Sequence, residues 1–591
     1  MIWIVAALSV LFGGAFLCLA TIGRPSWTRV VGPAVAVAAA LLGLPPVLMA
    51  LSGHSLGVLR LGWSMPFGSI LLALDALSAV FALPILAITA LSAIYGSAYL
   101  RDREGKRDIA ASWFFFHLLT ASMLLVVLAR DGLLFLLAWE AMSIASFFLV
   151  MFDSEKAGVR RAGWIYLIAA HIGAAFLLAL FALLGRGAEG LEFSGFARAA
   201  ALPGFAGAAF LLALVGFGAK AGFIPLHVWL PEAHPAAPSH VSAVMSGVMI
   251  KTGIYGLLRV LTFLGTPPPW WGWSLVAIGV VSGVLGVLFA LAQHDLKRLL
   301  AYHSVENIGI IALGIGIGLL GISYGSPAMA FLGLAGALLH VINHAVFKSL
   351  LFLSAGSVIH AAGTGDIEHL GGLLTRLPAT GLAFLGGSAA ICGLPPLNGF
   401  VSEFLIYLSS LRAVAEPSRQ PVGTVFAGMI GLAALALIGG LAVACFVKAF
   451  GVIFLGEPRS SASAAAHESG GAMKMPMAIL ATTCAAIGLG GSFIIPFLQP
   501  AVGVVAGLSS APAGVGDALT MIAAVATGGI GLALLLYWAR DRLLRGREVS
   551  ASVTWDCGYI APSPRMQYTA SSFADPLLRM FRVFLRTRRR F

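Results

Sequence analysis

The chain has 591 residues, is 59% hydrophobic and carries only 10% charged residues, with a mean hydropathy of +0.97. A soluble globular chain carries about 25% charged residues, so this composition excludes a soluble protein and predicts one that folds in lipid. The net charge of +12 does not indicate nucleic-acid binding, because the basic residues flank apolar segments and form a short tail with no basic domain behind them.

Apolar runs follow one another from residue 2 to residue 538. A hydrocarbon core of about 30 Å requires about 20 helical residues, and most of the runs have this length. The first run has no basic segment before it, so it is interpreted as a retained helix and not as a cleaved signal peptide. We predict an all-α polytopic membrane protein with about fifteen transmembrane helices, at 2–21, 30–52, 71–99, 109–129, 132–152, 162–184, 205–224, 238–264, 271–292, 304–322, 328–359, 379–411, 424–455, 474–498 and 516–538.

Lysine and arginine residues gather in loops that this order of helices places on one side of the membrane. They follow the third, fifth, ninth and last predicted helices: Arg101, Arg103, Lys106 and Arg107; Lys156, Arg160 and Arg161; Lys297 and Arg298; Arg540, Arg542, Arg545 and Arg547. Because basic loops stay in the cytoplasm, we predict that the C-terminus is cytoplasmic and the N-terminus lies outside.

Two stretches rich in proline and glycine interrupt the helical pattern at membrane depth. The first is KAGFIPLHVWLPEAHPAAPSH at 220–240, and the second is CGLPPLNGFVSEF at 392–404, about 170 residues further on. Paired broken helices in corresponding positions indicate an internal repeat with transport sites at the breaks. We therefore predict two five-helix repeats, inverted relative to each other because each has an odd number of helices.

The repeats divide the chain into five predicted parts. N-terminal accessory helices occupy 1–105, the first antiporter-like repeat 106–265, the inverted second repeat 266–456, C-terminal accessory helices 457–545 and a basic cytoplasmic tail 546–591. The end of the tail alternates apolar and basic residues, which suits a helix on the inner leaflet or against a partner.

Five ionisable residues lie well inside the predicted helices: Glu140, Lys220, Lys251, Lys348 and Glu403. Such a residue at the bilayer centre costs roughly 2.5–3.5 kcal/mol, so each needs a reason to be there. The alternatives to a transport path are side chains that reach the membrane surface from a helix end, and static ion pairs. Lys251 is ten or more residues from either end of its predicted helix, so its side chain is too far from a helix end to reach the membrane surface.

Glu140 and Lys220 have no oppositely charged neighbour three or four positions away, so any partner must come from another helix. We predict that they pair with each other. A static salt bridge is the alternative to a switching pair, and switching is favoured because Lys220 directly precedes the break at Pro225. Carrying one charge against about 150 mV takes roughly 3.5 kcal/mol, equivalent to a pKa change of about 2.6 as a carboxylate approaches and leaves a lysine.

His240 and Lys251 are eleven residues apart, so a continuous helix would place them on one face with about 16 Å between them. Water would have to bridge that distance, and the alternative for His240 is a helix-cap or core histidine. His227, Pro225, Pro395 and Pro396 are expected to line the breaks.

His340, His344 and Lys348 follow at steps of four on one helical face. Two histidines spaced in this way can chelate zinc, but the next residue on the stripe is a lysine and no acid or cysteine stands nearby, so a proton wire is favoured. The five cysteines have no C-x-x-C spacing. Neither a metal site nor a cofactor site is predicted in this chain.

With the Glu140 helix, the segments KAGFIPLHVWLPEAHPAAPSH, HVINHAVFKSLLF and GLPPLNGFVSEF make the chain resemble the antiporter-like membrane subunits of respiratory complex I, multi-subunit sodium/proton antiporters and energy-converting hydrogenases. The resemblance covers roughly 70–455. The tail segment 554–576 is similar to the large membrane subunit of hydrogenase-4 and formate hydrogenlyase, called component B or subunit 3.

The resemblance implies a fourteen-helix core with two inverted five-helix repeats and broken seventh and twelfth helices. It also implies that the five charged residues inside the helices match the family's proton path one by one. Some complex I relatives carry a lysine at the second break, where this chain has Glu403. The sequence after 498 is too short for the long lateral helix of some relatives plus its anchor.

These observations together predict a proton-translocating subunit of an energy-converting hydrogenase or complex I-like oxidoreductase, which moves protons by Glu/Lys pKa switching in a bacterial or archaeal inner membrane. The alternatives are a subunit of a cation/proton antiporter and a purely structural membrane anchor. Iron–sulfur and nickel–iron centres are expected on partner subunits. The expected partners are lipid, other antiporter-like membrane subunits, an H-like membrane subunit of the quinone-reductase type, and a soluble hydrogenase or dehydrogenase arm, but no nucleic acid.

Overall fold

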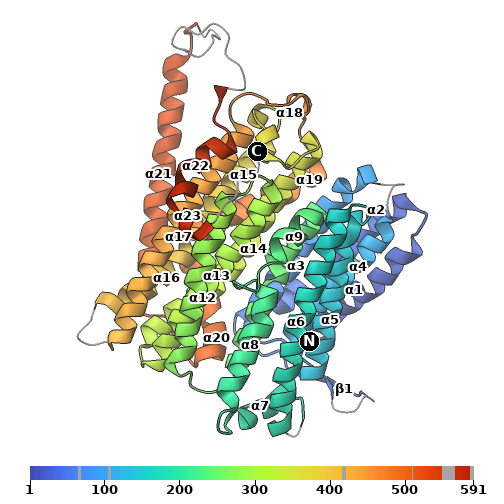
Figure 1. Cartoon of the computed structure of the whole chain (residues 1–591), viewed down its shortest axis with the longest axis vertical. Coiled ribbons are helices and arrows are strands. Elements are labelled where there is room, and N and C mark those ends of the chain that lie inside the picture. Colours follow the sequence, from blue (N-terminus) through green and yellow to red (C-terminus); the bar gives the residue numbers. More distant parts are fainter. Residues whose placement is uncertain are drawn as a thin grey trace.

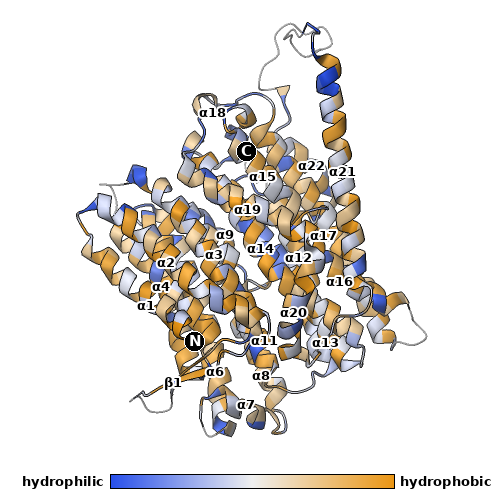
Figure 2. Cartoon of the chain, turned by 180° about the vertical axis from the view of Figure 1, so that it is seen from behind, coloured by the Kyte–Doolittle hydropathy of each residue, from blue (hydrophilic) through white to orange (hydrophobic). Residues whose placement is uncertain are grey.

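The computed structural model describes residues 1–63, 68–103, 108–188, 190–415, 421–508, 510–548 and 566–585. Within these ranges the chain is a bundle of helices with one small two-stranded sheet (Figure 1). Thirteen described helices are long and apolar enough to cross a membrane, and three shorter apolar helices accompany them. Figure 2 shows apolar residues along the bundle, with hydrophilic residues gathered mainly at helix ends and loops. The chain is therefore an all-α multi-pass membrane protein, as predicted.

The N-terminal part begins with two long helices and a short hairpin. These elements are α1 (Ile2–Ala20), α2 (Pro25–Leu51), β1 (Val58–Leu61), β2 (Ile70–Ala73) and α3 (Ala76–Tyr99). The strands pair antiparallel. The prediction of a helix from residue 71 is wrong for its first turn, because α3 starts only where the Asp75 side chain accepts a hydrogen bond from Ser78 N at 2.8 Å.

The next part contains the first predicted break. Its elements are η1 (Arg101–Arg103), α4 (Ile109–Leu128), α5 (Gly132–Val150), η2 (Met151–Asp153), α6 (Ala157–Ala188), α7 (Phe193–Ala200), α8 (Phe205–Ala221), α9 (Leu230–Ala236), α10 (Ser239–Val244), the π-helical turn η3 (Met245–Met249) and α11 (Lys251–Leu261). Helix α8 ends one residue after Lys220, where Gly222 adopts a φ of 90°. The first break is confirmed.

The second break lies between α15 and α16. This part comprises α12 (Pro269–Leu291), α13 (Leu296–Ser323), α14 (Pro327–Ala362), η4 (Ile367–His369), η5 (Leu373–Thr375), α15 (Pro378–Ile391), α16 (Asn398–Ala415) and α17 (Val422–Phe454). Helices α12 and α13 approach closely through glycine, since a Cβ atom on Gly279 would lie 2.6 Å from Leu313 N. The interruption predicted within 392–404 is confirmed, since α15 ends at Ile391 and α16 begins at Asn398.

The C-terminal part corrects one predicted helix. It comprises α18 (Ser461–Ala465), α19 (Gly471–Leu489), α20 (Gly491–Ala506), α21 (Val515–Leu544), α22 (Ala570–Met580) and α23 (Arg582–Leu585). The single helix predicted at 474–498 is wrong, because the chain leaves helical geometry at Gly490 and continues as α20. Helix α21 stands at the edge of the bundle (Figure 1).

The tail contacts loops of its own chain. The hydroxyl of Ser571, at the start of α22, donates to Glu368 at 2.5 Å, and Arg459 donates to the carbonyl of Tyr568 at 2.5 Å. These contacts precede the alternating apolar and basic segment, whose helix on the inner leaflet or against a partner stays a prediction, and residues 586–591 lie outside the described residues.

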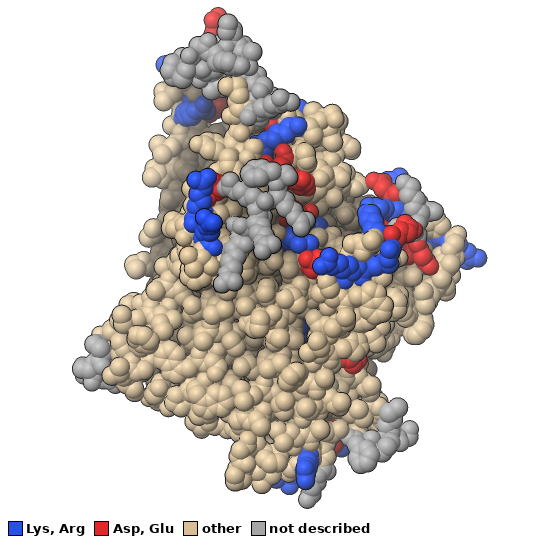
Figure 3. Space-filling model, in the orientation of Figure 1, with Lys and Arg blue, Asp and Glu red and all other residues tan. Residues whose placement is uncertain are grey.

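The basic loops lie at one end of the bundle, where Figure 3 shows lysine, arginine and acidic side chains grouped together. Arg103 after α3 lies 3.8 Å from Asp153 after α5, and His360 near the end of α14 lies 3.7 Å from Asp102. This end is called the basic end. The total of about fifteen helices, the inverted repeats and the five-part division stay predictions.

Candidate functional site

Lys220 lies buried in the last turn of α8, held by hydroxyl groups. Its Nζ donates to Ser143 Oγ on α5 at 2.8 Å and to Tyr166 OH on α6 at 3.2 Å. It also lies 5.5 and 5.3 Å from the ring centres of Trp139 and Tyr166, within the range of a cation–π interaction. These partners are neutral, so they hold the amine without fixing a second charge beside it.

Glu140 does not contact Lys220, and the predicted pair is therefore wrong for this structure. Its carboxylate lies 3.4 Å from His171 Nε2 on α6, and the Glu140 side chain is 31% exposed. Glu140 and Ser143 are three residues apart on α5, and Ser143 reaches Lys220 while Glu140 lies beside His171. His171 was missed, although it is an ionisable residue inside the predicted helix at 162–184.

His240 and Lys251 do not share a face, because the π-helical turn η3 lies between them. One extra residue in a turn rotates the rest of the helix by about 100°. His240 packs among aromatic rings, 5.7 Å from Phe116 and 6.2 Å from Trp113 between ring centres. Lys251 instead donates to the carbonyl of Ser246 within η3. The predicted water bridge between His240 and Lys251 loses its geometric basis.

Lys251 connects the first break to the second half of the chain. The hydroxyl of Ser246 hydrogen-bonds that of Ser304 on α13 at 2.7 Å, and Lys251 interacts electrostatically with Lys348 and His344 on α14. Lys348 is fully buried, and its Nζ has no hydrogen-bond partner among the described residues.

The stripe on α14 faces inward. The rings of His340 and His344 stack with centres 6.5 Å apart, and both residues are fully buried. Across the described ranges no group of three or more His, Cys, Asp or Glu residues could hold a metal ion. Neither ring nitrogen of His344 has a partner there. This leaves His344 free to bind water on a path between Lys348 and His340.

His340 is held by two side chains that fix the roles of its nitrogens. Asn307 on α13 donates its amide to the carbonyl of His303 at 2.8 Å, so its oxygen faces His340 Nε2 at 3.0 Å and requires a proton on Nε2. On the other side, Nδ1 lies 2.9 Å from Ser402 Oγ on α16. Neutral His340 is therefore the Nε2–H tautomer.

The Ser402 hydroxyl can satisfy both protonation states of His340. It accepts from Asn343 at 3.0 Å and has two acceptors for its single proton, His340 Nδ1 at 2.9 Å and the Gly399 carbonyl at 3.0 Å. With neutral His340 the hydroxyl donates to Nδ1. With the imidazolium, Nδ1–H donates to Oγ and the hydroxyl turns to Gly399. A site that satisfies both states suits a proton carrier.

Replacing Ser402 by alanine should therefore slow proton translocation about tenfold, because His340 Nδ1 loses its partner and an unsatisfied buried polar group costs about 1–3 kcal/mol. The rate of vesicle acidification during turnover measures this. Ser402→Thr, which keeps the hydroxyl, should restore the rate. Ser409→Ala is the matched control, since Ser409 is equally buried on α16 but donates only to the Met329 carbonyl at 2.8 Å. Wild-type rates for Ser402→Ala would contradict the role given to the hydroxyl.

Glu403 lies at the second break, next to Ser402. A Cβ atom on Gly393 would lie 2.7 Å from its Oε2, so the carboxylate rests against the backbone between α15 and α16 at 8% exposure. Pro395 and Pro396 form this break as predicted.

The first break exposes Pro225 and partly exposes His227, whose ring centre lies 6.3 Å from those of Phe289 and Tyr302. His234 is fully buried, and neither of its ring nitrogens has a partner among the described residues.

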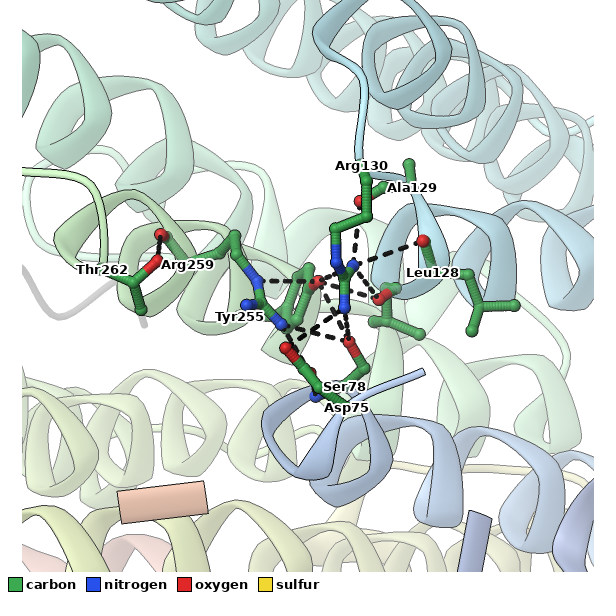
Figure 4. Close-up of polar contacts among 9 residues, drawn as sticks. Asp75, Ser78, Leu128, Ala129, Arg130, Tyr255, Arg259 and Thr262 are labelled. Atoms are coloured by element: carbon green, nitrogen blue, oxygen red, sulfur yellow. Dashed lines mark hydrogen bonds and ion pairs between the residues drawn. The ribbon is translucent and has the colours of Figure 1, made fainter. Parts of the chain in front are cut away.

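A charge cluster away from the axis was missed. Asp75 at the start of α3 lies 2.7 Å from Arg259 on α11 and 3.3 Å from Arg130 between α4 and α5 (Figure 4). Ser78 and Tyr255 complete it, with Arg130 donating to Ser78 Oγ at 2.9 Å and Tyr255 donating to the Val127 carbonyl at 2.8 Å.

The cluster joins the start of α3, the connection between α4 and α5, and α11 through charged side chains. Burial raises the pKa of Asp75, but the two guanidinium groups and the Ser78 N–H outweigh it and hold the pKa well below its ordinary value. The sequence shows these charges only as residues at the ends of predicted helices, so nothing in it indicated that they meet.

Comparisons with known proteins place this chain in a family. The family model described as NADH:quinone oxidoreductase/Mrp antiporter, transmembrane, matches residues 129–417. Hydrogenase-4 component B of Escherichia coli K12 is 40% identical over 558 residues, which are 90% of this chain and 80% of that relative. The chain belongs to the antiporter-like membrane subunits. The resemblance seen in the motifs is confirmed.

A second relative and a solved structure are also similar to this chain. Formate hydrogenlyase subunit 3 of Escherichia coli K12 is 38% identical over 379 residues, which are 64% of this chain and 61% of that relative. A chain of the membrane-bound sulfane sulfur reductase, an archaeal respiratory membrane complex, superimposes with a TM-score of 0.79 at 23% identity, covering 98% of this chain and 92% of that chain. The second comparison shows the fold alone. The distinctive tail stretch 554–565 lies outside the described residues.

Proposed function

We propose that this chain is the proton-translocating membrane subunit of an energy-converting hydrogenase or related complex I-like oxidoreductase in a bacterial or archaeal inner membrane. The observation that carries the proposal is the buried polar axis between the two breaks. From Lys220 through Lys251, Lys348 and His340 to Glu403, every member is at most 8% exposed. Charged groups at this depth are costly, and the breaks open the helices at both ends of the axis.

The proposed mechanism is pKa switching, in which a carboxylate that approaches a buried lysine favours its charged form and releases the proton when it leaves. The positions of Glu140 and Lys220 support it. In this structure the lysine is held by Ser143 and Tyr166 while Glu140 lies with His171. Glu140 and Ser143 are one helical turn apart on α5, so a small change of helix phase or rotamer would exchange the partners.

The proposed proton route continues along the second half. Lys251 passes the proton to the group formed by Lys348 and His344, from which it reaches His340 and then Glu403 at the second break. Support comes from the burial of Lys251, Lys348 and His344 and from the two hydrogen-bond partners of His340, Asn307 and Ser402. His240 is the weakest member of the predicted set, because its ring packs among aromatic side chains.

We propose that the basic end faces the cytoplasm, by the positive-inside rule. That places the N-terminus outside. The expected partners are other antiporter-like membrane subunits, an H-like membrane subunit of the quinone-reductase type, and a soluble hydrogenase or dehydrogenase arm. Iron–sulfur clusters and nickel–iron or other redox centres belong, in this proposal, to those partners, while this chain holds no cofactor.

A cation/proton antiporter subunit is the second candidate, because the matching family model includes Mrp antiporters. The same axis would then be driven by an ion gradient. Its chemistry favours protons, since sodium is bound by clustered oxygen ligands and the axis consists mainly of lysine and histidine.

The test uses the intact complex in sealed vesicles with a pH-sensitive dye. The proposal predicts that electron transfer acidifies or alkalises the lumen in sodium- and potassium-free buffer, and that a protonophore collapses the gradient. Proton flux that requires an imposed sodium or potassium gradient and does not depend on electron transfer would favour the antiporter and contradict the proposal.

A further inference from the structure

His303 and Glu306, two of the buried ionisable residues on α13, have no role in the route described so far. His303 is fully buried and Glu306 is 1% exposed, and His303 Nδ1 contacts Glu306 Oε2 directly. They are three residues apart, the spacing that brings side chains together on a helix. Both lie at the level of the axis, next to Ser304, which reaches Lys251 through Ser246.

The backbone around Glu306 is held tightly. A Cβ atom on Gly286 of α12 would lie 2.6 Å from Glu306 N, so α12 presses directly on this turn of α13. On the other side the His303 ring lies 4.6 Å from that of Phe446 on α17, between ring centres. Because a lone buried charge is expensive, the two residues are stable together either as an ion pair or as a neutral acid and imidazole. In both forms they share one proton.

The pair is connected to the axis on two sides. Asn307 donates to Glu306 Oε2 at 3.4 Å while its oxygen accepts from His340 Nε2 at 3.0 Å. Glu306 also interacts electrostatically with Lys348, whose amine has no hydrogen-bond partner in the described ranges. The Cys445 thiol of α17 also faces His303. The pair therefore lies beside one carrier, and its carboxylate can take up an incoming proton while the imidazolium of His303 keeps both of its N–H groups.

We propose that His303 and Glu306 form a proton-holding dyad, a further carrier site beside Lys348 and His340. The proposal rests on the proton-translocating function. The Lys348 ammonium gives one proton to the dyad, leaving a neutral amine and a dyad that holds two protons, the carboxylic acid and the imidazolium. The dyad returns one proton to the axis at His340. Total charge in the buried region stays constant during the first transfer, so no additional charge has to be desolvated.

The test is Glu306→Gln in the intact complex in vesicles, with assembly and electron transfer measured alongside acidification. Proton translocation should fall about tenfold or more, the scale expected for loss of a proton-transfer group, while electron transfer and assembly persist. Glu306→Asp should retain most of the translocation. Glu192→Gln is the matched control, since Glu192 is a partly exposed carboxylate paired with Arg60 at 2.7 Å outside the axis.

A spectroscopic readout separates proton carrying from a structural role. Redox-induced infrared difference spectra should contain the carbonyl-stretching band of a protonated carboxylic acid that is missing in Glu306→Gln and retained in Glu192→Gln. If Glu306→Gln does not assemble, His303→Gln takes its place in the same translocation assay with the same expected loss.

The outcomes distinguish the dyad from the proposed function. Suppose that Glu306→Gln, or His303→Gln in its place, translocates protons at the wild-type rate while Lys348→Met loses translocation. This result would overturn the dyad and leave the proposed function standing. Wild-type translocation in both variants would overturn the function itself. The dyad would also be overturned if Glu306→Asp lost translocation as fully as Glu306→Gln and the carboxylic-acid band persisted in Glu306→Gln. That result would identify a static buried pair.

Discussion

Replacing Lys220 by methionine should abolish proton translocation while the complex still assembles. Methionine has a similar length and no charge, so the aromatic contacts with Trp139 and Tyr166 remain while the proton-binding group is lost. The hydroxyls of Ser143 and Tyr166 still have other partners, which limits the damage to the fold. Vesicle acidification and the rate of electron transfer, recorded on the same preparation, measure the effect.

Lys448→Met is the matched control for this substitution. Lys448 is as deeply buried as Lys220, but its Nζ donates to the carbonyls of Leu291 and Gln293 at the end of α12, at 2.7 and 2.9 Å. Its loss should lower stability and leave coupling intact. Undiminished acidification in Lys220→Met, or equal loss in both variants, would contradict a specific role for Lys220.

Asp75→Asn should destabilise the chain by about 3 kcal/mol. Asparagine still caps α3, so the substitution removes the charge and leaves Arg259, which is 7% exposed, without its carboxylate. Breaking a buried pair from one side costs about 3–5 kcal/mol, and the lower end applies because the Asp75 side chain is 32% exposed. Thermal unfolding of the purified complex in detergent, followed by intrinsic fluorescence, measures the loss.

The same pair predicts a dependence on pH. Because the folded pKa of Asp75 is depressed, its stabilising contribution is fully present above the unfolded pKa of about 3.9 and is lost as the pH falls below that value.

The control for Asp75→Asn is Asp541→Asn, since Asp541 forms an exposed pair with Arg545 at 3.0 Å that should contribute less than about 1 kcal/mol. Equal unfolding temperatures for Asp75→Asn and Asp541→Asn would contradict the account of the cluster.

The sequence predicted the membrane-crossing helices and both breaks because hydropathy and proline positions are properties of a single segment. The cost of charge at membrane depth likewise identified Lys220, Lys251 and Lys348 without knowledge of their partners. Which of these residues carry protons stays a prediction.

Contacts between helices could not be predicted in the same way. The π-helical turn at 245–249 changes neither composition nor length, yet it separates the faces of His240 and Lys251. The phase of α5, which sends Glu140 to His171, depends on packing against α6 and α8.

The start of α13 was predicted too late in the sequence, which hid the depth of two residues. The prediction began α13 at residue 304, whereas the helix begins at Leu296, where Asp295 accepts a hydrogen bond from Arg298 N at 2.8 Å. His303 and Glu306 therefore looked like residues at the membrane edge, and their depth emerged only from the structure. The helix break at Gly490 was missed for a related reason, since no proline or charge interrupts the apolar run there.

The central claim is that one continuous axis links the two breaks, and the most direct test is the number of protons translocated per electron. It should be counted for the wild type, Lys220→Met, Glu403→Gln and the double variant in the same vesicles. Residues that act in series on one path are not additive, so each single variant and the double variant should lower the ratio by the same amount. Losses that add in the double variant, or an unchanged ratio in either single variant, would contradict the single axis.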